Sequence, residues 1–219
     1  MAEQQERNEP AGKAFIGCAP ATPALGGCTP AASALGGCTS SGCASDDPTH
    51  AEDKHFMRLA IEQARLAAQA DEVPIGAVVV KDGEVLAAAH NRRETDADPA
   101  AHAEFLAVEE ASRVLDAWRL TGCTVYVTLE PCIMCAGLLH QARIDRCVYG
   151  APDPKAGALG TLYAVHADER LNHRFEAQPG VCEEECAALL RAFFAAKRAV
   201  RKEQRQADRA CDSTERASE

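Results

Sequence analysis

Long apolar runs are missing from this sequence. No stretch approaches the about 18 consecutive apolar residues that a membrane-spanning helix needs, and runs such as residues 77–80 have only the length of a strand. The start of the chain also lacks the basic segment and apolar core of a secretory signal. We therefore expect a soluble, cytoplasmic protein with no membrane partner. In that compartment its 11 cysteines should be reduced thiols or metal ligands rather than disulfides.

An excess of positive charge is also absent. The net charge of −10 at pH 7 argues, taken alone, against a nucleic-acid partner. Residues 191–209, however, contain seven basic and two acidic residues, which gives this segment a local charge of +5. A basic helix on an acidic protein can bind RNA, and the same pattern is equally typical of an ordinary solvated helix. Charge therefore leaves an RNA partner open.

The first 48 residues have almost no aromatic side chains. Phe15 is the single one, and the segment is rich in Ala, Gly, Pro, Ser and Thr, with a Gly-Cys pair repeated every ten residues, at Cys18, Cys28 and Cys38. Such a composition cannot bury enough apolar surface to offset the entropy of ordering. We predict a disordered, low-complexity extension over residues 1–48. Without His or a C-x-x-C pair, metal binding by these cysteines is the weaker interpretation.

Regular patterning begins near Thr49 and predicts one folded domain over residues 49–206, followed by a disordered tail over 207–219. Asp82-Gly83 separates two apolar, β-branched runs and is a strong hairpin signal. We expect helices over residues 53–70, 101–115, 131–140 and 182–206, and strands over 73–81, 84–90, 124–129 and 146–149. This order of elements implies an α/β fold in which a mixed sheet lies between layers of helices.

Two short motifs stand at the starts of predicted helices. One is His102-Ala103-Glu104, and the other runs from Pro131 through Cys132 to Cys135, with Pro131 expected at the first helical position. Thiolates are stabilised at a helix N-terminus. One imidazole and two thiolates suit a tetrahedral zinc ion with one position open to water, and zinc lowers the pKa of that water to about 7.

Glu104 lies too close to His102 in sequence to ligate the same ion without strain, but it can reach the water. A carboxylate there can accept the proton of the water and pass it to the substrate nitrogen and the departing ammonia. This is the arrangement described for zinc-dependent nucleobase deaminases.

A structural zinc site is the main alternative, and it needs a fourth protein ligand. The candidate ligands are Cys123, Cys147, Cys182 and Cys186, although each is also typical of a small side chain packed in a core. A fourth thiolate in the site would contradict the catalytic interpretation.

Around these motifs the sequence resembles the bacterial tRNA-specific adenosine deaminases, the TadA family of the cytidine and deoxycytidylate deaminase superfamily. The resemblance covers about residues 50–200 and is carried by residues 73–77, 91–92, 98–104, 127–137, 140–143, 150–157 and 171–174. The first motif has His102 where free-cytidine deaminases usually carry Cys, which disfavours that branch.

This resemblance implies a three-layer α/β/α, cytidine-deaminase-like fold with a mixed five-stranded sheet. It implies one zinc ion per chain on His102, Cys132 and Cys135, with Glu104 as the proton shuttle and Asn91 hydrogen-bonded to the purine. It also implies a homodimer that binds tRNA and hydrolytically converts the wobble adenosine of an arginine tRNA to inosine with release of ammonia.

Two departures from the family and several alternatives accompany this prediction. Arg93 stands where family members commonly have Pro, and the extension over 1–48 has no counterpart. Deaminases of guanine or deoxycytidylate share both motifs, and a non-catalytic zinc- and RNA-binding partner is a third possibility, which the intact Glu104 disfavours. Asn91 could instead form an Asx-turn, and Asp153 and Lys155 could be turn residues rather than RNA contacts.

Overall fold

A computed structural model describes residues 48–216 of the chain, and the extension predicted over residues 1–48 therefore lies, except for Pro48, outside the described residues. The elements follow one another as α1 (Pro48–Gln69), β1 (Gly76–Lys81), β2 (Glu84–His90), α2 (Arg93–Asp96), α3 (Ala103–Val114), β3 (Cys123–Leu129), α4 (Ile133–Ala142), β4 (Arg146–Ala151), the 3-10 helix η1 (Val165–Ala167), β5 (Glu176–Gln178) and α5 (Glu183–Arg216). No helix among residues 48–216 has the length and apolar character that crossing a membrane requires.

The five strands form one mixed sheet in the order β2-β1-β3-β4-β5. β1 pairs antiparallel with β2 and β3, whereas β3, β4 and β5 run parallel to one another. The predicted hairpin is confirmed: Asp82 and Gly83 join β1 to β2, with φ angles of 51° and 78°. A positive φ at both central residues is what a tight hairpin turn compatible with strand twist demands.

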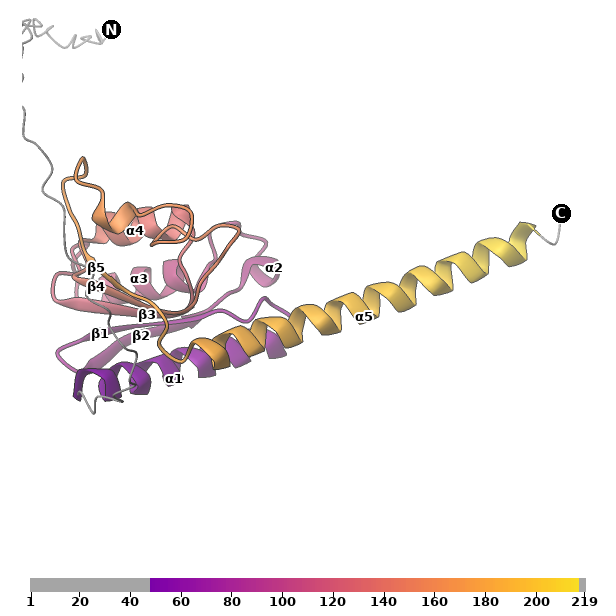
Figure 1. Cartoon of the computed structure of the whole chain (residues 1–219), viewed down its shortest axis with the longest axis horizontal. Helices are drawn as coiled ribbons and strands as arrows, with labels where there is room; N and C mark the ends of the chain where they lie inside the picture. The colour runs from indigo at the N-terminus through magenta and orange to yellow at the C-terminus, as the bar shows by residue number, and fades with distance from the viewer. Residues whose placement is uncertain (1–47, 217–219) are drawn as a thin grey trace, which may run out of the picture. The chain divides into compact units, whose positions relative to one another are not determined.

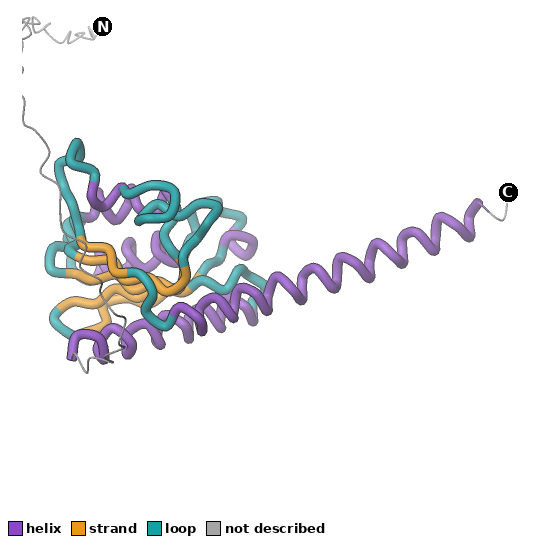
Figure 2. The backbone as a smooth tube through the Cα atoms, viewed as in Figure 1, coloured by secondary structure: helices purple, strands orange, loops and turns teal. Residues whose placement is uncertain are grey.

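Helices cover both faces of the sheet, so the three-layer α/β/α prediction is confirmed (Figures 1 and 2). β1 shows how side-chain alternation separates the two layers. Ala77 and Val79 pack with residues of α3 and α4 in one apolar cluster. Val78 and Val80 pack with residues of α1 and the start of α5 in the other. All four are buried, as expected for a strand covered on both faces.

The C-terminal helix differs from its prediction. We expected an end near Gln206 and a disordered tail over 207–219, but α5 continues to Arg216, past the sheet (Figure 1). Residues 183–216 contain no Pro or Gly to end a helix. The predicted end was based on the apolar stripe, which stops before the helix does. Only the first part of α5 packs on the domain, where Cys186 is buried and Arg65 of α1 pairs with Glu185 at 2.9 Å.

Smaller differences concern short or terminal segments. α1 begins at Pro48 rather than at residue 53, and the segment predicted as a loop after β2 contains the single-turn helix α2. The residue pattern did not indicate β5, which came only from the family resemblance. β5 has three residues, none of them buried, and so it is too short to show an alternation.

Candidate active site

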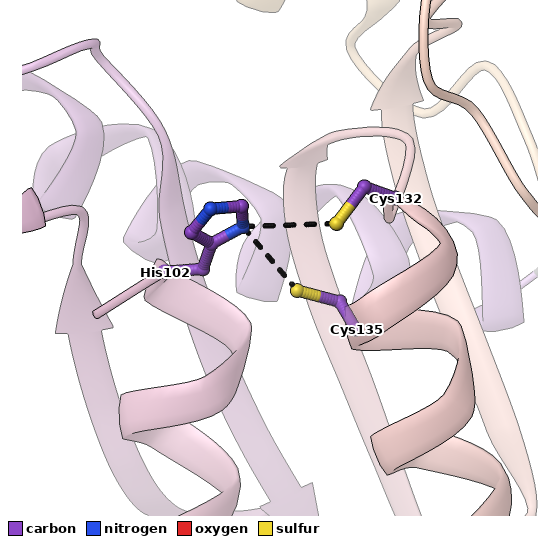
Figure 3. A group of neighbouring side chains, drawn as sticks. All are labelled: His102, Cys132 and Cys135. Atoms are coloured by element: carbon purple, nitrogen blue, oxygen red, sulfur yellow. Dashed lines mark hydrogen bonds between the residues drawn. The ribbon is translucent and has the colours of Figure 1, made fainter. Parts of the chain in front are cut away.

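The starts of α3 and α4 lie next to each other and carry the two predicted motifs. His102 is the N-cap residue of α3, and its carbonyl accepts the Leu106 N–H at 3.0 Å. Cys132 is the N-cap residue of α4, and Cys135 lies in the first turn of that helix. The His102 Nδ1 atom is 3.8 Å from Cys132 Sγ and 3.5 Å from Cys135 Sγ (Figure 3). Two helix starts 30 residues apart in sequence therefore bring three ligand atoms together.

Pro131 lies just outside α4, and its predicted place at the first helical position is wrong. Cys132 caps the helix and Ile133 is the first helical residue. Proline is tolerated two residues before the first helical position as well, because only its carbonyl is used there, to accept the Ala158 N–H at 2.9 Å. The shift places the Cys132 side chain at the cap, where it faces His102.

The three side chains fit a zinc ion with one open position. Their ligand atoms all lie within 4.8 Å of one another, and the group contains no fourth residue among the side chains described between residues 48 and 206. Cys123, Cys147 and Cys186 are instead buried in the apolar clusters, and Cys182 is half-buried against one of them. One nitrogen and two sulfur ligands are the donor set that zinc prefers. The described residues thus offer no ligand that would close the site.

The pKa values of the two cysteines in the site shift in opposite directions. The pKa of Cys132 is lowered to about 3, first by the hydrogen bond from Cys135 and then by the one from His102. The same hydrogen bond to Cys132, together with burial, raises the pKa of Cys135. A thiolate is the form of cysteine that binds metal, so the surroundings of Cys132 favour metal binding.

Glu104 lies in the first turn of α3 and is buried, with 4% of its surface exposed. Burial is the main reason that the pKa of its carboxyl is raised. Between residues 48 and 206 no arginine or lysine forms an ion pair with it, and it does not belong to the group of three ligands. A buried carboxyl with a raised pKa beside a metal site has the properties of a group that exchanges protons.

Asn91 follows β2 directly and has only 3% of its surface exposed. Its Nδ2 atom donates a hydrogen bond to Glu72 Oε2 at 3.0 Å. An Asx-turn would use the Oδ1 atom to accept a backbone N–H two residues on, and no such bond is found among the described residues. The next residue, Arg92, donates its N–H to the Ala101 carbonyl at 3.0 Å. Ala101 directly precedes His102, the N-cap residue of α3. This hydrogen bond therefore holds the segment that contains Asn91 next to the start of α3.

Glu72 and Glu130 are two buried acids that the sequence analysis missed. Glu72 belongs to no motif, and Glu130 lies in the segment 127–137 that carries the family resemblance, where no role was predicted for it. An acidic residue at the end of a helix or strand carries no signal of burial. Glu130 accepts hydrogen bonds from the N–H groups of Asp153, Leu159 and Thr161, each at 3.0 Å, and from the Thr161 hydroxyl. It therefore organises the loop between β4 and η1.

This loop approaches the candidate zinc ligand Cys132. Gly157 forms a β-bridge with Cys132, and a Cβ atom at Gly157 would lie 2.3 Å from Glu130 Oε2, so only glycine fits. The Asp153 carboxylate accepts the Lys155 N–H at 2.9 Å. That contact agrees with the turn-residue interpretation of Asp153.

Comparison with known proteins identifies the relatives of the chain. The MafB19-like deaminase family matches residues 51–198. The tRNA-specific adenosine deaminase of Bacillus subtilis is 49% identical over 156 residues, which is 71% of this chain and 95% of that protein. The protein of the same name from Agrobacterium fabrum is 46% identical over 148 residues, covering 68% of this chain and 97% of its own length.

Solved structures agree with these relatives. One comes from studies of A-to-I editing by tRNA deaminases at the wobble position of transfer RNA. It is 45% identical, has a TM-score of 0.60 and covers 62% of this chain and 99% of its own. A second, of NE0047 in complex with 2,6-diaminopurine, is 26% identical with a TM-score of 0.57 and covers 65% of this chain and 82% of its own. The chain belongs to the MafB19-like deaminase family and, among its members, to the tRNA-specific adenosine deaminases.

Proposed function

We propose that this protein hydrolytically deaminates the wobble adenosine of a tRNA to inosine and releases ammonia. The observation that carries the proposal is the meeting of His102, Cys132 and Cys135 beside the buried Glu104, in a chain that belongs to the tRNA-specific adenosine deaminases. The arginine tRNA named above as the implied substrate remains part of the proposal, as do a homodimeric state and a cytoplasmic location.

His102, Cys132 and Cys135 would hold one zinc ion per chain. When bound, zinc supplies a Lewis acid that lowers the pKa of a coordinated water. Glu104, in the first turn of α3, would carry the two protons of the attacking water in turn, the first to the ring nitrogen and the second to the departing amine, so that the oxygen stays on the ring carbon and ammonia leaves. Asn91 would hydrogen-bond the purine and hold its reactive carbon in place.

An RNA substrate is supported by a basic face on α5. We use this name for Arg198, Arg201, Lys202 and Arg205, which are exposed and spaced so that they share one side of the helix. None of the four forms an ion pair with another residue between 48 and 206, whereas Arg191 pairs with Glu184 and Lys197 with Asp71. Cations that have no carboxylate partner can bind phosphates without first breaking an ion pair within the protein.

The proposed reaction is tested by incubating the purified full-length protein with a tRNA pool, with free guanine and with deoxycytidylate. We expect inosine at the wobble position, ammonia from the tRNA reaction, and about one zinc ion per chain by elemental analysis. Ammonia from guanine or deoxycytidylate but not from tRNA would assign the site to a free base or nucleotide. RNA binding without ammonia from any substrate would indicate a non-catalytic partner.

The basic face is tested by the salt dependence of tRNA binding. R201Q/R205Q should flatten the plot of log affinity against log salt by about one to two units, because each lost phosphate contact removes nearly one unit of slope. The control K54Q/R58Q removes the same charge from exposed positions on α1 and should leave the slope unchanged. Equal slopes for the two variants would make the basic face an ordinary solvated surface.

A further inference from the structure

Glu72 is a buried carboxylate outside the zinc motifs that contacts the predicted substrate-binding residue. It lies in the turn between α1 and β1, yet only 1% of its surface is exposed. Its Oε2 atom accepts the hydrogen bond from Asn91 Nδ2 at 3.0 Å, and its Oε1 atom accepts the Thr95 N–H at 2.7 Å. No arginine or lysine between residues 48 and 206 forms an ion pair with it. A buried acid at a turn is costly, so its contacts indicate a use.

Both contacts of Glu72 reach the segment that follows β2. Asn91 is the first residue after the strand, and Thr95 lies in the short helix α2. The Asn91 N–H is itself held by the Ile75 carbonyl at 3.0 Å, at the start of β1. Hydrogen bonds thus fix both parts of Asn91: Ile75, the residue before β1, holds its main chain, and Glu72 holds its side chain.

The contact with Glu72 determines which end of the Asn91 amide faces it. The oxygen and nitrogen of an asparagine amide have nearly the same shape, and only their hydrogen-bond partners distinguish them. A carboxylate already bonded to the Thr95 N–H can offer Asn91 an acceptor and no donor. The Asn91 Nδ2 atom must therefore face Glu72, which leaves the Oδ1 atom and the second Nδ2 hydrogen for another partner.

We propose that Glu72 is a positioning residue that fixes the amide orientation of Asn91 and so determines the donor and acceptor pattern offered to the target base. This inference rests on the proposed function, because it takes Asn91 as the residue that hydrogen-bonds the purine. Glu72 does not touch the base and acts only through Asn91. A base is recognised by a matching donor and acceptor pattern, so reversal of the amide weakens recognition of adenine without removing Asn91.

The substitution Glu72→Gln tests the orientation because it keeps the shape and adds a donor. If the new amide keeps its oxygen on the Thr95 N–H, its nitrogen faces Asn91 Nδ2, and two donors cannot bond. Asn91 must then turn its oxygen toward residue 72 and exchange the groups that it offers to the base. We expect kcat/KM for an adenosine-containing anticodon hairpin to fall about 10-fold to 100-fold, the range of a hydrogen bond left unmade.

A double-mutant cycle separates positioning from a structural role. Single-turnover deamination of the hairpin is measured for wild type, E72Q, N91A and E72Q/N91A. Residues that act as one unit are not additive, so E72Q should cost less than about 2-fold in the N91A background. E94Q makes the same chemical change on the exposed surface of α2 and should have no effect in either background.

Equal losses from E72Q in both backgrounds would overturn the inference and give Glu72 a purely structural role. If E72Q does not fold, E72D replaces it, because a shorter carboxylate still offers only acceptors. E72D should then keep the preference for adenosine over other bases while turning over more slowly, and a lost preference would likewise overturn the inference. Failure of the wild-type protein to form inosine would instead reject the proposed function.

Discussion

Asp53 and Glu104 are equally buried carboxylates on opposite faces of the sheet, each with 4% of its surface exposed. Asp53 of α1 accepts two hydrogen bonds from the Arg146 guanidinium, at 2.7 and 2.8 Å, and one from the Tyr126 hydroxyl at 3.0 Å. Glu104 of α3 has no arginine or lysine partner between residues 48 and 206. Burial of a charge is costly unless it is paired.

The difference indicates what each carboxylate is for. Asp53 joins α1 to β3 and β4 through a paired charge with well-formed hydrogen bonds, which is the way a buried acid contributes to a unique packing. Glu104 has no cationic partner among the side chains described between residues 48 and 206, and its side-chain hydrogen bond is with Cys135, one of the three candidate zinc ligands. Stability therefore depends on the first carboxylate, and chemistry, in our proposal, on the second.

Replacement of Glu104 by Gln should have the largest effect, and it should fall on turnover. We expect single-turnover deamination of tRNA to slow by at least about 10²-fold, the lower range for a positioned acid–base group. The zinc content, the melting temperature and the tRNA affinity should stay close to those of the wild type, because Glu104 is not among the ligands. Loss of zinc from E104Q would show that Glu104 is a ligand, and near-normal turnover would contradict its role as a proton carrier.

Replacement of Asp53 by Asn should have the opposite signature. The variant leaves the partly buried Arg146 with the exposed Glu176 as its remaining carboxylate partner. Breaking a buried ion pair typically costs about 3–5 kcal/mol of unfolding free energy, and we expect a loss up to that size. Chemical denaturation measures this loss, while the rate constant per folded molecule at low temperature should remain unchanged. The matched control is E52Q on the exposed side of α1, which should alter neither quantity. If folded D53N lost turnover as strongly as E104Q, the assignment of Asp53 to stability and Glu104 to chemistry would be wrong.

Glu130 is an intermediate case, because it is satisfied by backbone donors rather than by a cation. Burial opposes its ionisation, but hydrogen bonds from Thr161, Asp153 and Leu159 outweigh burial and lower its pKa. E130Q should cost about 1–3 kcal/mol of unfolding free energy, the penalty of a donor left unsatisfied. We expect E130Q to have a smaller effect than E104Q or D53N. The pH dependence of its loss in unfolding free energy distinguishes it from the other two.

The sign of that pH dependence follows from the direction of the shift. A carboxyl whose pKa is lower in the folded state stabilises the fold above its unfolded pKa, and the stabilisation is lost as the pH falls through the folded pKa. The gap in unfolding free energy between wild type and E130Q should therefore be widest near neutral pH and shrink in acid. A gap that stays constant from neutral pH into acid would show that the lost hydrogen bonds do not depend on the charge of Glu130.

Local patterns in the sequence determined much of this protein. Asp82-Gly83 predicted the β1–β2 hairpin because positive φ angles favour such residues. The apolar, β-branched runs predicted the strands, and the order of helices and strands predicted a sheet between layers of helices. The residues His102, Glu104, Cys132 and Cys135 were predicted from their chemistry at helix starts. The roles of Glu104 and Asn91 stay predictions until the substitutions described above are measured.

Only the tertiary structure decided which distant groups meet. β2 and β3 both run antiparallel to β1, so their C-terminal ends lie at the same edge of the sheet, and α3 and α4 begin beyond those ends. His102 Nδ1 and Cys132 Sγ therefore approach to 3.8 Å. The contacts of Glu72 with Asn91 and of Glu130 with Thr161 span 19 and 31 residues. No periodicity marks an acid that will be buried, and β5 is too short to show one. Periodicity in the sequence shows which face of a helix or strand is apolar. Burial of a single polar side chain depends instead on hydrogen-bond partners far away in the sequence, and only the folded structure brings these partners near.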